Sequence, residues 1–304
     1  MPKESLISPL EIAGKQADVG SDWHIKPEAL PRAIDHLREN RKSELLFCMG
    51  DLFDAQEGQD TSAAINELLQ AIAPGYEAVI FTPGNHDLRG RDNPWGSFSL
   101  PKNVHYPRNE AKVVTLGDRS ILVADLFYDM QFVDPAQIGL SWEEVIRQYA
   151  ESNDGKHFLK GATEPFKEMT ENAAVLLQPN IDILATHSLP HPSLVTFRVP
   201  ELTEEVQRLA RESGLQFICA PEEDITKARR WNSTTAEGFR KWWNIKSIFM
   251  GSNVLEHPSA NVKDGLWAVH GHHHRVDLRQ RTVQGRRVNI ATHQPNPWKW
   301  ETPL

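Results

Sequence analysis

The stretch ELLFCMGDLFD, residues 44–54, contains an apolar run that stops at Gly50 and is followed at once by Asp51. An apolar run bounded by a glycine is typical of a buried strand in a layered α/β protein. The glycine lets the backbone turn sharply out of the strand, so that the Asp51 carboxylate is aimed beyond the strand end. We therefore expect residues 44–50 to form a strand of an α/β fold, with Asp51 at a functional edge.

Further apolar runs alternate with helical patterns along the chain, which favours an α/β layered fold. The candidate strands are EAVIFTPG (77–84), SILVADLF (120–127), IDILATHS (181–188), LWAVHG (266–271) and VNIATH (288–293). The candidate helices are PEALPRAIDHLREN (27–40) and TSAAINELLQAIA (61–73). The stretch AKVVTLGDRSILVAD (111–125) predicts a hairpin that turns at Gly117 and Asp118.

The bulk properties favour one elaborated domain. A chain of 304 residues can bury a large core, and we interpret 1–304 as a single domain with an inserted helical cap over 190–262. The formal charge of −8 argues against sequence-independent nucleic-acid binding over the whole surface, although a polyanionic substrate is compatible with it. The two cysteines lie in apolar runs, and the sequence shows neither a signal peptide nor a membrane span, so we expect a cytoplasmic protein.

Residue types that bind metals recur at successive strand ends. The segments are SDWH (21–24), MGDLFD (49–54), PGNHD (83–87), ATHS (185–188) and GHHH (271–274). Carboxylates, imidazoles and a carboxamide are donors that divalent cations accept, and two cations ~3.5 to 4 Å apart need a carboxylate that bridges them. Asp51 is the natural bridging ligand, because Gly50 precedes it.

The ordered set D-x-H, G-D-x-x-D, G-N-H-D, H and G-H-x-H resembles the signature of the calcineurin-like metallophosphoesterases. This resemblance implies a double β-sandwich flanked by helices, which is a four-layer α/β/β/α fold, with a two-metal centre. It also implies that a hydroxide bridging the two metals attacks phosphorus in line. The donor set suits manganese, iron, zinc, cobalt or nickel, of which we favour manganese.

The resemblance also assigns a role to each residue of the motifs. One metal would be held by Asp22, His24, Asp51 and His274, and the other by Asp51, Asn85, His187 and His272. His86, oriented by Asp54, would stabilise the developing charge or protonate the leaving oxygen. His191 is an alternative to His187, but His187 directly follows an apolar strand whereas His191 lies beyond a proline.

Two basic stretches bear on the substrate. Residues 226–246, TKARRWNSTTAEGFRKWWNIK, place Trp231, Trp242 and Trp243 among lysines and arginines. Indoles stack on bases, so this stretch could bind a nucleotide or a single strand. The alternative is that these tryptophans pack the insertion against the sandwich. In RVDLRQRTVQGRR (275–287), Arg275 is close enough to the metal motif to approach a substrate.

We expect a two-metal phosphoesterase that prefers phosphodiesters, with a nucleotide or a nucleic-acid end as substrate, because the insertion is placed to cover a leaving group. The alternative is a phosphomonoesterase or pyrophosphohydrolase that acts on a small phosphorylated metabolite. A third hypothesis, a non-catalytic scaffold on the same fold, ranks last, since it predicts eroded ligand positions. The Ser/Thr protein phosphatases resemble one another in having arginine at the position of Ala55 and glutamate at the position of Asp87. This difference disfavours phosphoproteins as the substrate. The sequence does not indicate an oligomeric state.

Overall fold

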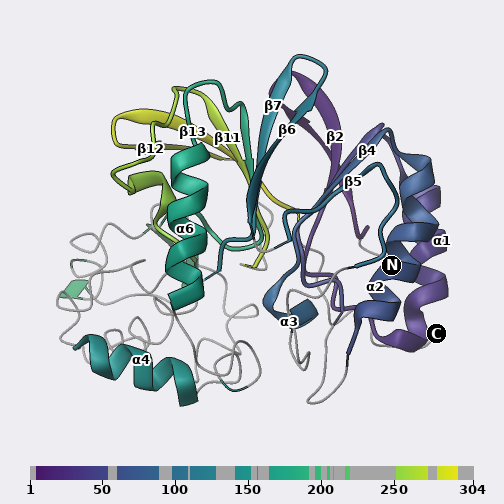
Figure 1. Cartoon of the computed structure of the whole chain (residues 1–304), viewed down its shortest axis with the longest axis horizontal. Helices are drawn as coiled ribbons and strands as arrows, with labels where there is room; N and C mark the ends of the chain where they lie inside the picture. Colours follow the sequence, from purple (N-terminus) through teal and green to yellow (C-terminus); the bar gives the residue numbers. More distant parts are fainter. Residues whose placement is uncertain are drawn as a thin grey trace.

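The computed structural model describes residues 5–53, 60–88, 98–108, 110–127, 141–151, 164–191, 251–272 and 279–293, with short pieces at 156, 196–199, 204–205, 208 and 216–219. In this part of the chain, two mixed β-sheets pack against each other and helices lie on their outer faces (Figure 1). The expected four-layer α/β/β/α sandwich is thereby confirmed.

The first sheet has the strand order β1-β2-β3-β4-β5. Its strands are β1 (Ser8–Ile12), β2 (Lys15–Gly20), β3 (Leu45–Cys48), β4 (Ala78–Phe81) and β5 (Val104–His105). β1 is antiparallel to β2, whereas β2, β3, β4 and β5 run parallel to one another. Because these four strands are parallel, the loops that follow them emerge at one edge of the sheet.

Two helices cover the outer face of the first sheet (Figure 1). They are α1 (Leu30–Asn40), which follows the short helix η1 (Pro27–Ala29), and α2 (Ser62–Ile72), which leads into η2 (Ala73–Gly75). The buried residues of α1 recur at helical spacing, and Pro31 lies in its first turn, where no backbone N–H is needed. Both helices lie where the sequence predicts them.

The second sheet has the strand order β12-β13-β11-β8-β7-β6. Its strands are β6 (Ala111–Leu116), β7 (Arg119–Ala124), β8 (Ile183–Ala185), β11 (Leu266–Val269), β12 (Arg279–Val283) and β13 (Arg286–Ala291). β7, β8, β11 and β13 are parallel, and the predicted hairpin joins β6 to β7 with Leu116 opposite Arg119. Gly117 takes a φ of +60° in that turn.

Alternation along the strands divides the core into layers. In β3, Leu46 and Cys48 face the helices, whereas Phe47 lies between the sheets. In β7, Leu122 packs with helix α6 (Glu164–Leu176), whereas Val123 faces the first sheet. The apolar strands of this protein are therefore buried on both faces, as their uninterrupted apolar runs predict.

The described residues of the 190–262 segment form two strands and a short helix. β9 (Thr196–Val199) and β10 (Gln216–Cys219) form a separate two-stranded parallel sheet. At the far end, η8 (Val254–Glu256) packs with α6 on the second sheet. Most of the segment that we expect to form a helical cap lies outside the described residues.

Two further helices have bounds within the described residues. α3 (Asn85–Leu88) is a single turn directly after β4, and α4 (Trp142–Glu151) lies apart from the two sheets in Figure 1. None of the helices described in this chain has the length and apolar character needed to cross a membrane.

Candidate metal centre

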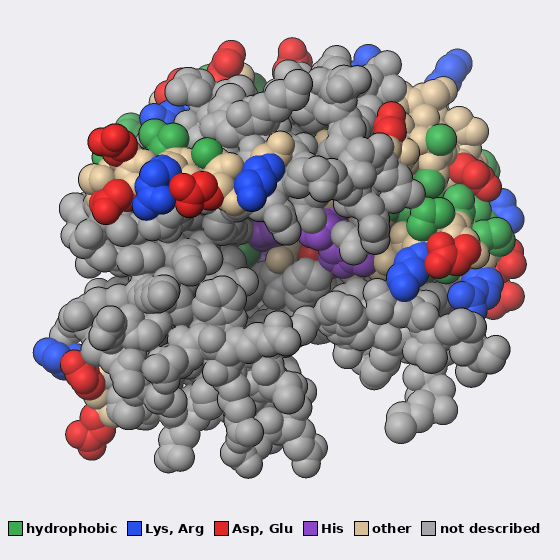
Figure 2. All heavy atoms as spheres, turned by 90° about the horizontal axis from the view of Figure 1, so that it is seen from below, with side chains coloured by type: hydrophobic (Ala, Val, Ile, Leu, Met, Phe, Trp, Pro, Cys, Tyr) green, Lys and Arg blue, Asp and Glu red, His purple; other side chains and the backbone are tan. Residues whose placement is uncertain are grey.

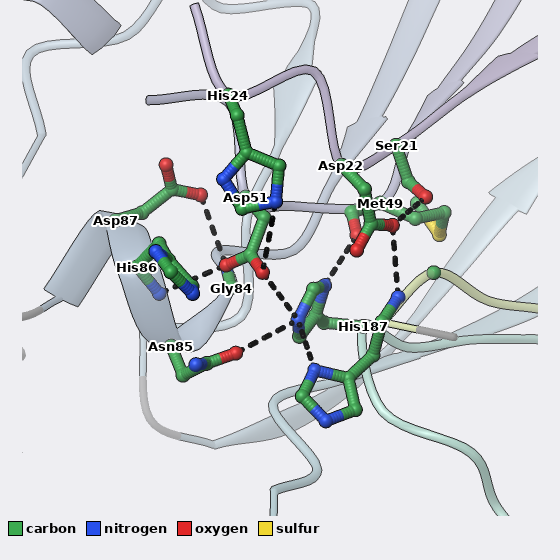
Figure 3. Close-up of polar contacts among 12 residues, drawn as sticks. Ser21, Asp22, His24, Met49, Asp51, Gly84, Asn85, His86, Asp87 and His187 are labelled. Atoms are coloured by element: carbon green, nitrogen blue, oxygen red, sulfur yellow. Dashed lines mark hydrogen bonds and ion pairs between the residues drawn. The ribbon is translucent and has the colours of Figure 1, made fainter. Parts of the chain in front are cut away.

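The loops that follow five parallel strands bring polar side chains together at one end of the sandwich (Figure 3). From the first sheet come Asp22, His24, Asp51, Asn85 and His86, and from the second sheet come His187 and His272. Seen from below, histidine side chains are visible inside a hollow of the surface (Figure 2). The sequence thus predicts correctly that these motifs lie at strand ends.

One group of donors is centred on His187, which is fully buried. Its Nε2 atom lies 3.2 Å from Oδ1 of Asn85, 3.2 Å from Nδ1 of His272 and 3.5 Å from Oδ2 of Asp51. Its other ring nitrogen, Nδ1, lies 2.7 Å from the carbonyl oxygen of Met49, which fixes the orientation of the ring. Asp51, His187 and His272 form one of the two described sets whose ligand atoms all lie within 4.8 Å of one another.

The second such set consists of Asp22, His24 and Asp51. Nε2 of His24 lies 4.0 Å from Oδ2 of Asp51, the oxygen that also faces His187 (Figure 3). The Asp22 carboxylate accepts hydrogen bonds from the Ser21 hydroxyl and from the backbone N–H of His272, the latter at 2.9 Å. Asp51 therefore belongs to both sets, as a bridging ligand must.

The donor set fits divalent cations. Carboxylate oxygens and imidazole nitrogens are the donors that manganese, iron and zinc accept, and here they are brought together from different loops. Asp22, Asp51 and His187 are at most 1% exposed, so their charges are held out of water. Such groups are costly to bury unless they pair or bind metal.

The Trp23 side chain anchors the loop that carries Asp22 and His24. It is fully buried, and its indole N–H donates to the carbonyl oxygen of Leu6 at 2.7 Å. The backbone N–H of Asp22 donates to the carbonyl oxygen of Gly50 at 2.8 Å, and the backbone N–H of His24 donates to the carbonyl oxygen of Asp51 at 3.0 Å. These bonds align the first loop with the neighbouring loop after β3.

Three glycines allow the loops to approach. A Cβ on Gly84 would lie 2.0 Å from Oδ1 of Asp51, and one on Gly50 would lie 2.4 Å from the backbone nitrogen of Gly84. A Cβ on Gly271 would lie 2.6 Å from the carbonyl oxygen of Met49. Any side chain at these positions would displace a loop that carries a candidate ligand.

Left-handed backbone is concentrated at the same place. Among the described residues other than glycine, seven have positive φ, and four of them are candidate ligands: Asp22 (+53°), His24 (+44°), Asp51 (+52°) and His272 (+66°). This conformation costs roughly 1 to 3 kcal/mol for a residue with a side chain, and it clusters at functional sites. The strain is independent evidence that the loops are shaped for their donor atoms.

The charges of the group stabilise one another. Burial alone would raise the pKa of the Asp51 carboxyl, but His187, His86 and His24 hold that pKa well below its usual range. Burial would likewise lower the pKa of His187, yet the Asp51 carboxylate raises it to about 9. Asp51 is thus ionised, and the pair draws its stability from opposite charge.

His86 contacts both Asp51 and His24. Its backbone N–H donates to Oδ1 of Asp51 at 2.8 Å, and its ring lies edge-on to the His24 ring, with centroids 4.7 Å apart. Its side chain is only partly buried. Asp54, the residue expected to orient it, lies outside the described residues.

Sequence reasoning assigned no role to Asp87 within the site. The structure shows a fully buried carboxylate that accepts backbone N–H groups from Leu52, Phe53 and Gly84. Burial and the nearby Asp51 charge raise its pKa to about 7, against the lowering effect of these hydrogen bonds. Its place in PGNHD, directly after two site residues, was the only signal in the sequence.

Other expected site residues are placed elsewhere or are not described. His191 belongs to neither set of candidate ligands, and its Nε2 atom lies 2.8 Å from a carboxylate oxygen of Glu256. The residues outside the described part are Asp54, Trp231, Trp242, His274 and Arg275.

Comparison with known proteins identifies a family over most of the chain. The family model described as calcineurin-like phosphoesterase matches residues 19–276, which include every motif from SDWH to GHHH. No curated protein gives a significant match. Among solved structures, 30 chains match. One is a phosphopantetheinyl hydrolase from Mycobacterium tuberculosis, with 16% identity over 95% of this chain and 93% of that chain and a TM-score of 0.48.

Proposed function

This chain belongs to the calcineurin-like phosphoesterases, and we propose that within this family it is a two-metal phosphodiesterase that acts on a nucleotide or on a nucleic-acid end. As a member of the family it is a metal-dependent phosphoric ester hydrolase. One observation carries the proposal of two metals: Asp51 belongs to both sets of candidate ligands.

The proposed ligand sets follow the two groups of donors. Asp22, His24 and Asp51, together with His274, hold one cation, and Asp51, Asn85, His187 and His272 hold the other. When bound there, divalent cations polarise the phosphoryl oxygen and lower the pKa of a water molecule, and manganese is the cation that we favour.

The chain's own residues orient the ester and supply a proton. The edge contact with His24 holds the His86 ring at the rim of the donor cluster, where its imidazole N–H reaches the leaving oxygen. We assign Asp54 the role of orienting this ring, as its motif implies. The N–H of His86 also fixes Oδ1 of Asp51, so one residue serves both the ligand set and the leaving group.

The preference for diesters comes from the 190–262 segment, which we assign as a cap inserted into the single domain. A diester has a second substituent whose binding can be used to lower the barrier, and Trp231, Trp242 and Arg275 are the residues that we propose contact it. The buried free thiol of Cys48 suits the cytoplasm as the place of action.

Hydrolysis of bis-p-nitrophenyl phosphate beside p-nitrophenyl phosphate tests the proposal. The protein is stripped of metal, manganese is restored, and Asp51→Asn serves as the inactive control. We expect faster turnover of the diester, which disappears in the variant. A preference for the monoester would exclude the phosphodiesterase assignment, and activity of Asp51→Asn equal to that of the wild type would exclude the bridging role.

A further inference from the structure

We propose that Asp87 is the positioning residue that keeps the Asp51 carboxylate in place, by tying the loop after β3 to the loop after β4. This inference rests on the proposed role of Asp51 as a shared metal ligand. Asp87 belongs to neither set of candidate ligands, and its side chain is fully buried. It therefore acts on the centre through other residues.

The carboxylate of Asp87 binds the backbone on both sides of the junction. Oδ1 accepts the N–H groups of Leu52 and Phe53 at 2.8 and 3.1 Å, directly after Asp51 in the chain. Oδ2 accepts the N–H group of Gly84 at 3.0 Å, directly before Asn85. One side chain thus fixes the backbone next to a ligand from each of two loops.

Asp51 returns the contact. Its Oδ1 atom accepts the backbone N–H of His86 at 2.8 Å, and His86 lies beside Asp87 in the turn α3 that follows the β4 loop (Figure 3). Each loop therefore supplies a carboxylate that caps the backbone of the other. Asp51 has left-handed backbone, with φ of +52°, which the chain keeps only where its surroundings hold it. The bonds from Asp87 to the next two N–H groups provide such a hold.

The geometry requires two acceptor oxygens on the side chain. An asparagine offers one acceptor oxygen and one NH2 donor, so it can accept from Leu52 and Phe53 or from Gly84, but not from both sides. In Asp87→Asn one buried backbone N–H would face the NH2 group, and the link between the loops would open on that side. Loss of an outer partner of a metal site typically lowers metal affinity roughly 10- to 100-fold.

Asp18, in β2 of the first sheet, is a matched control. It is also fully buried, and it accepts the backbone N–H groups of Lys42 and Ser43 at 3.0 and 3.3 Å and the Tyr76 hydroxyl at 3.2 Å. It lies within β2, away from both ligand sets. Asp18→Asn should therefore lower Tm as Asp87→Asn does, while its metal binding stays at the wild-type level.

The test is manganese binding by the full-length wild type, Asp87→Asn and Asp18→Asn. Manganese binding is measured by titration, and the pairing of two ions is detected by the electron paramagnetic resonance signal of a coupled manganese pair. We expect that signal in the wild type and in Asp18→Asn, and roughly 10- to 100-fold weaker binding with loss of coupling in Asp87→Asn. Binding and coupling in Asp87→Asn equal to those of Asp18→Asn would overturn the positioning role. A wild type without a metal pair would instead overturn the proposed two-metal function.

A milder variant keeps the test decisive if Asp87→Asn does not fold. The Thr61 hydroxyl donates to the backbone carbonyl oxygen of Asp87 at 3.2 Å, and Thr61 is 3% exposed. Thr61→Val removes this bond with little change in shape and leaves the Asp87 carboxylate intact. Because the lost bond holds the backbone of the turn from which the Asp87 carboxylate reaches both loops, we expect a smaller loss of manganese affinity in the same direction. Wild-type affinity and coupling would overturn the inference.

Discussion

Nε2 of His187 lies 3.2 Å from Nδ1 of His272, although 85 residues separate them in the chain. The two histidines follow β8 and β11, which are neighbouring parallel strands. The N–H of Gly271, next to His272, donates to the carbonyl oxygen of His187 at 2.9 Å, so the pairing of the strands continues into the loops. The sheet itself therefore sets the distance between the two imidazoles.

Replacing His187 should separate its role from that of the nearby His191. His187→Ala removes the nitrogen around which Asn85 and His272 gather, and we expect manganese affinity to fall by at least roughly 10- to 100-fold. His191→Ala removes a group paired with Glu256 and should bind manganese as the wild type does. Isothermal titration of both variants measures this difference, and equal affinities would exclude His187 as a ligand.

Gly84 should tolerate no side chain. The added methyl of Gly84→Ala would lie 2.0 Å from Oδ1 of Asp51, so the loops must separate, at a cost of about 1 to 3 kcal/mol in the free energy of unfolding. In Gly75→Ala the nearest atom is the flexible end of Arg41 at 3.2 Å, which can move aside. Urea unfolding and metal titration of the pair check the prediction. If Gly84→Ala kept both stability and metal, the close approach would have no functional meaning.

His86→Ala should retain metal but turn over slowly. Loss of a general acid typically costs roughly 100- to 10,000-fold, and the loss grows as the leaving group becomes more basic. We expect a steeper dependence of kcat on leaving-group pKa across a series of aryl phosphodiesters than in the wild type. Equal slowing for every leaving group would argue for electrostatic stabilisation in place of proton transfer.

Trp242→Ala tests whether the insertion contacts the substrate. We expect a raised KM for a dinucleotide diester with unchanged Tm, because a stacking partner for a base is lost. Trp142→Ala is the control, since this tryptophan of α4 is 44% exposed and has no proposed role. A variant at Trp242 that no longer folds would favour the alternative in which the tryptophans only pack the insertion.

The strands of the inner layers could be predicted from the sequence, because they are buried on both faces and are therefore uninterrupted apolar runs. β1 and β2 could not, since SPLEI and KQADVG mix polar and apolar residues, and β1 lies at the edge of its sheet. The β6–β7 hairpin could be predicted from its turn, since Gly117 supplies the positive φ that the turn requires.

The candidate site was predictable as a set of residues but not as a geometry. Asp22, Asp51 and His187 follow strands, and parallel strands end at one edge, which is enough to bring them together. The role of Asp87 depends on how β3 aligns with β4, where Cys48 pairs with Phe81, and no pattern in the sequence gives that register. Contacts to backbone groups of distant residues cannot be derived from side-chain motifs.

Four candidate ligands combine a left-handed backbone, which costs stability, with a side chain that donates to the proposed metals. Glycine would adopt the backbone conformation of Asp22, His24, Asp51 and His272 without strain, but it would delete a donor atom at each position. The strained backbone and the donor atoms are therefore properties of the same four residues, and relief of the strain by glycine would remove the donors.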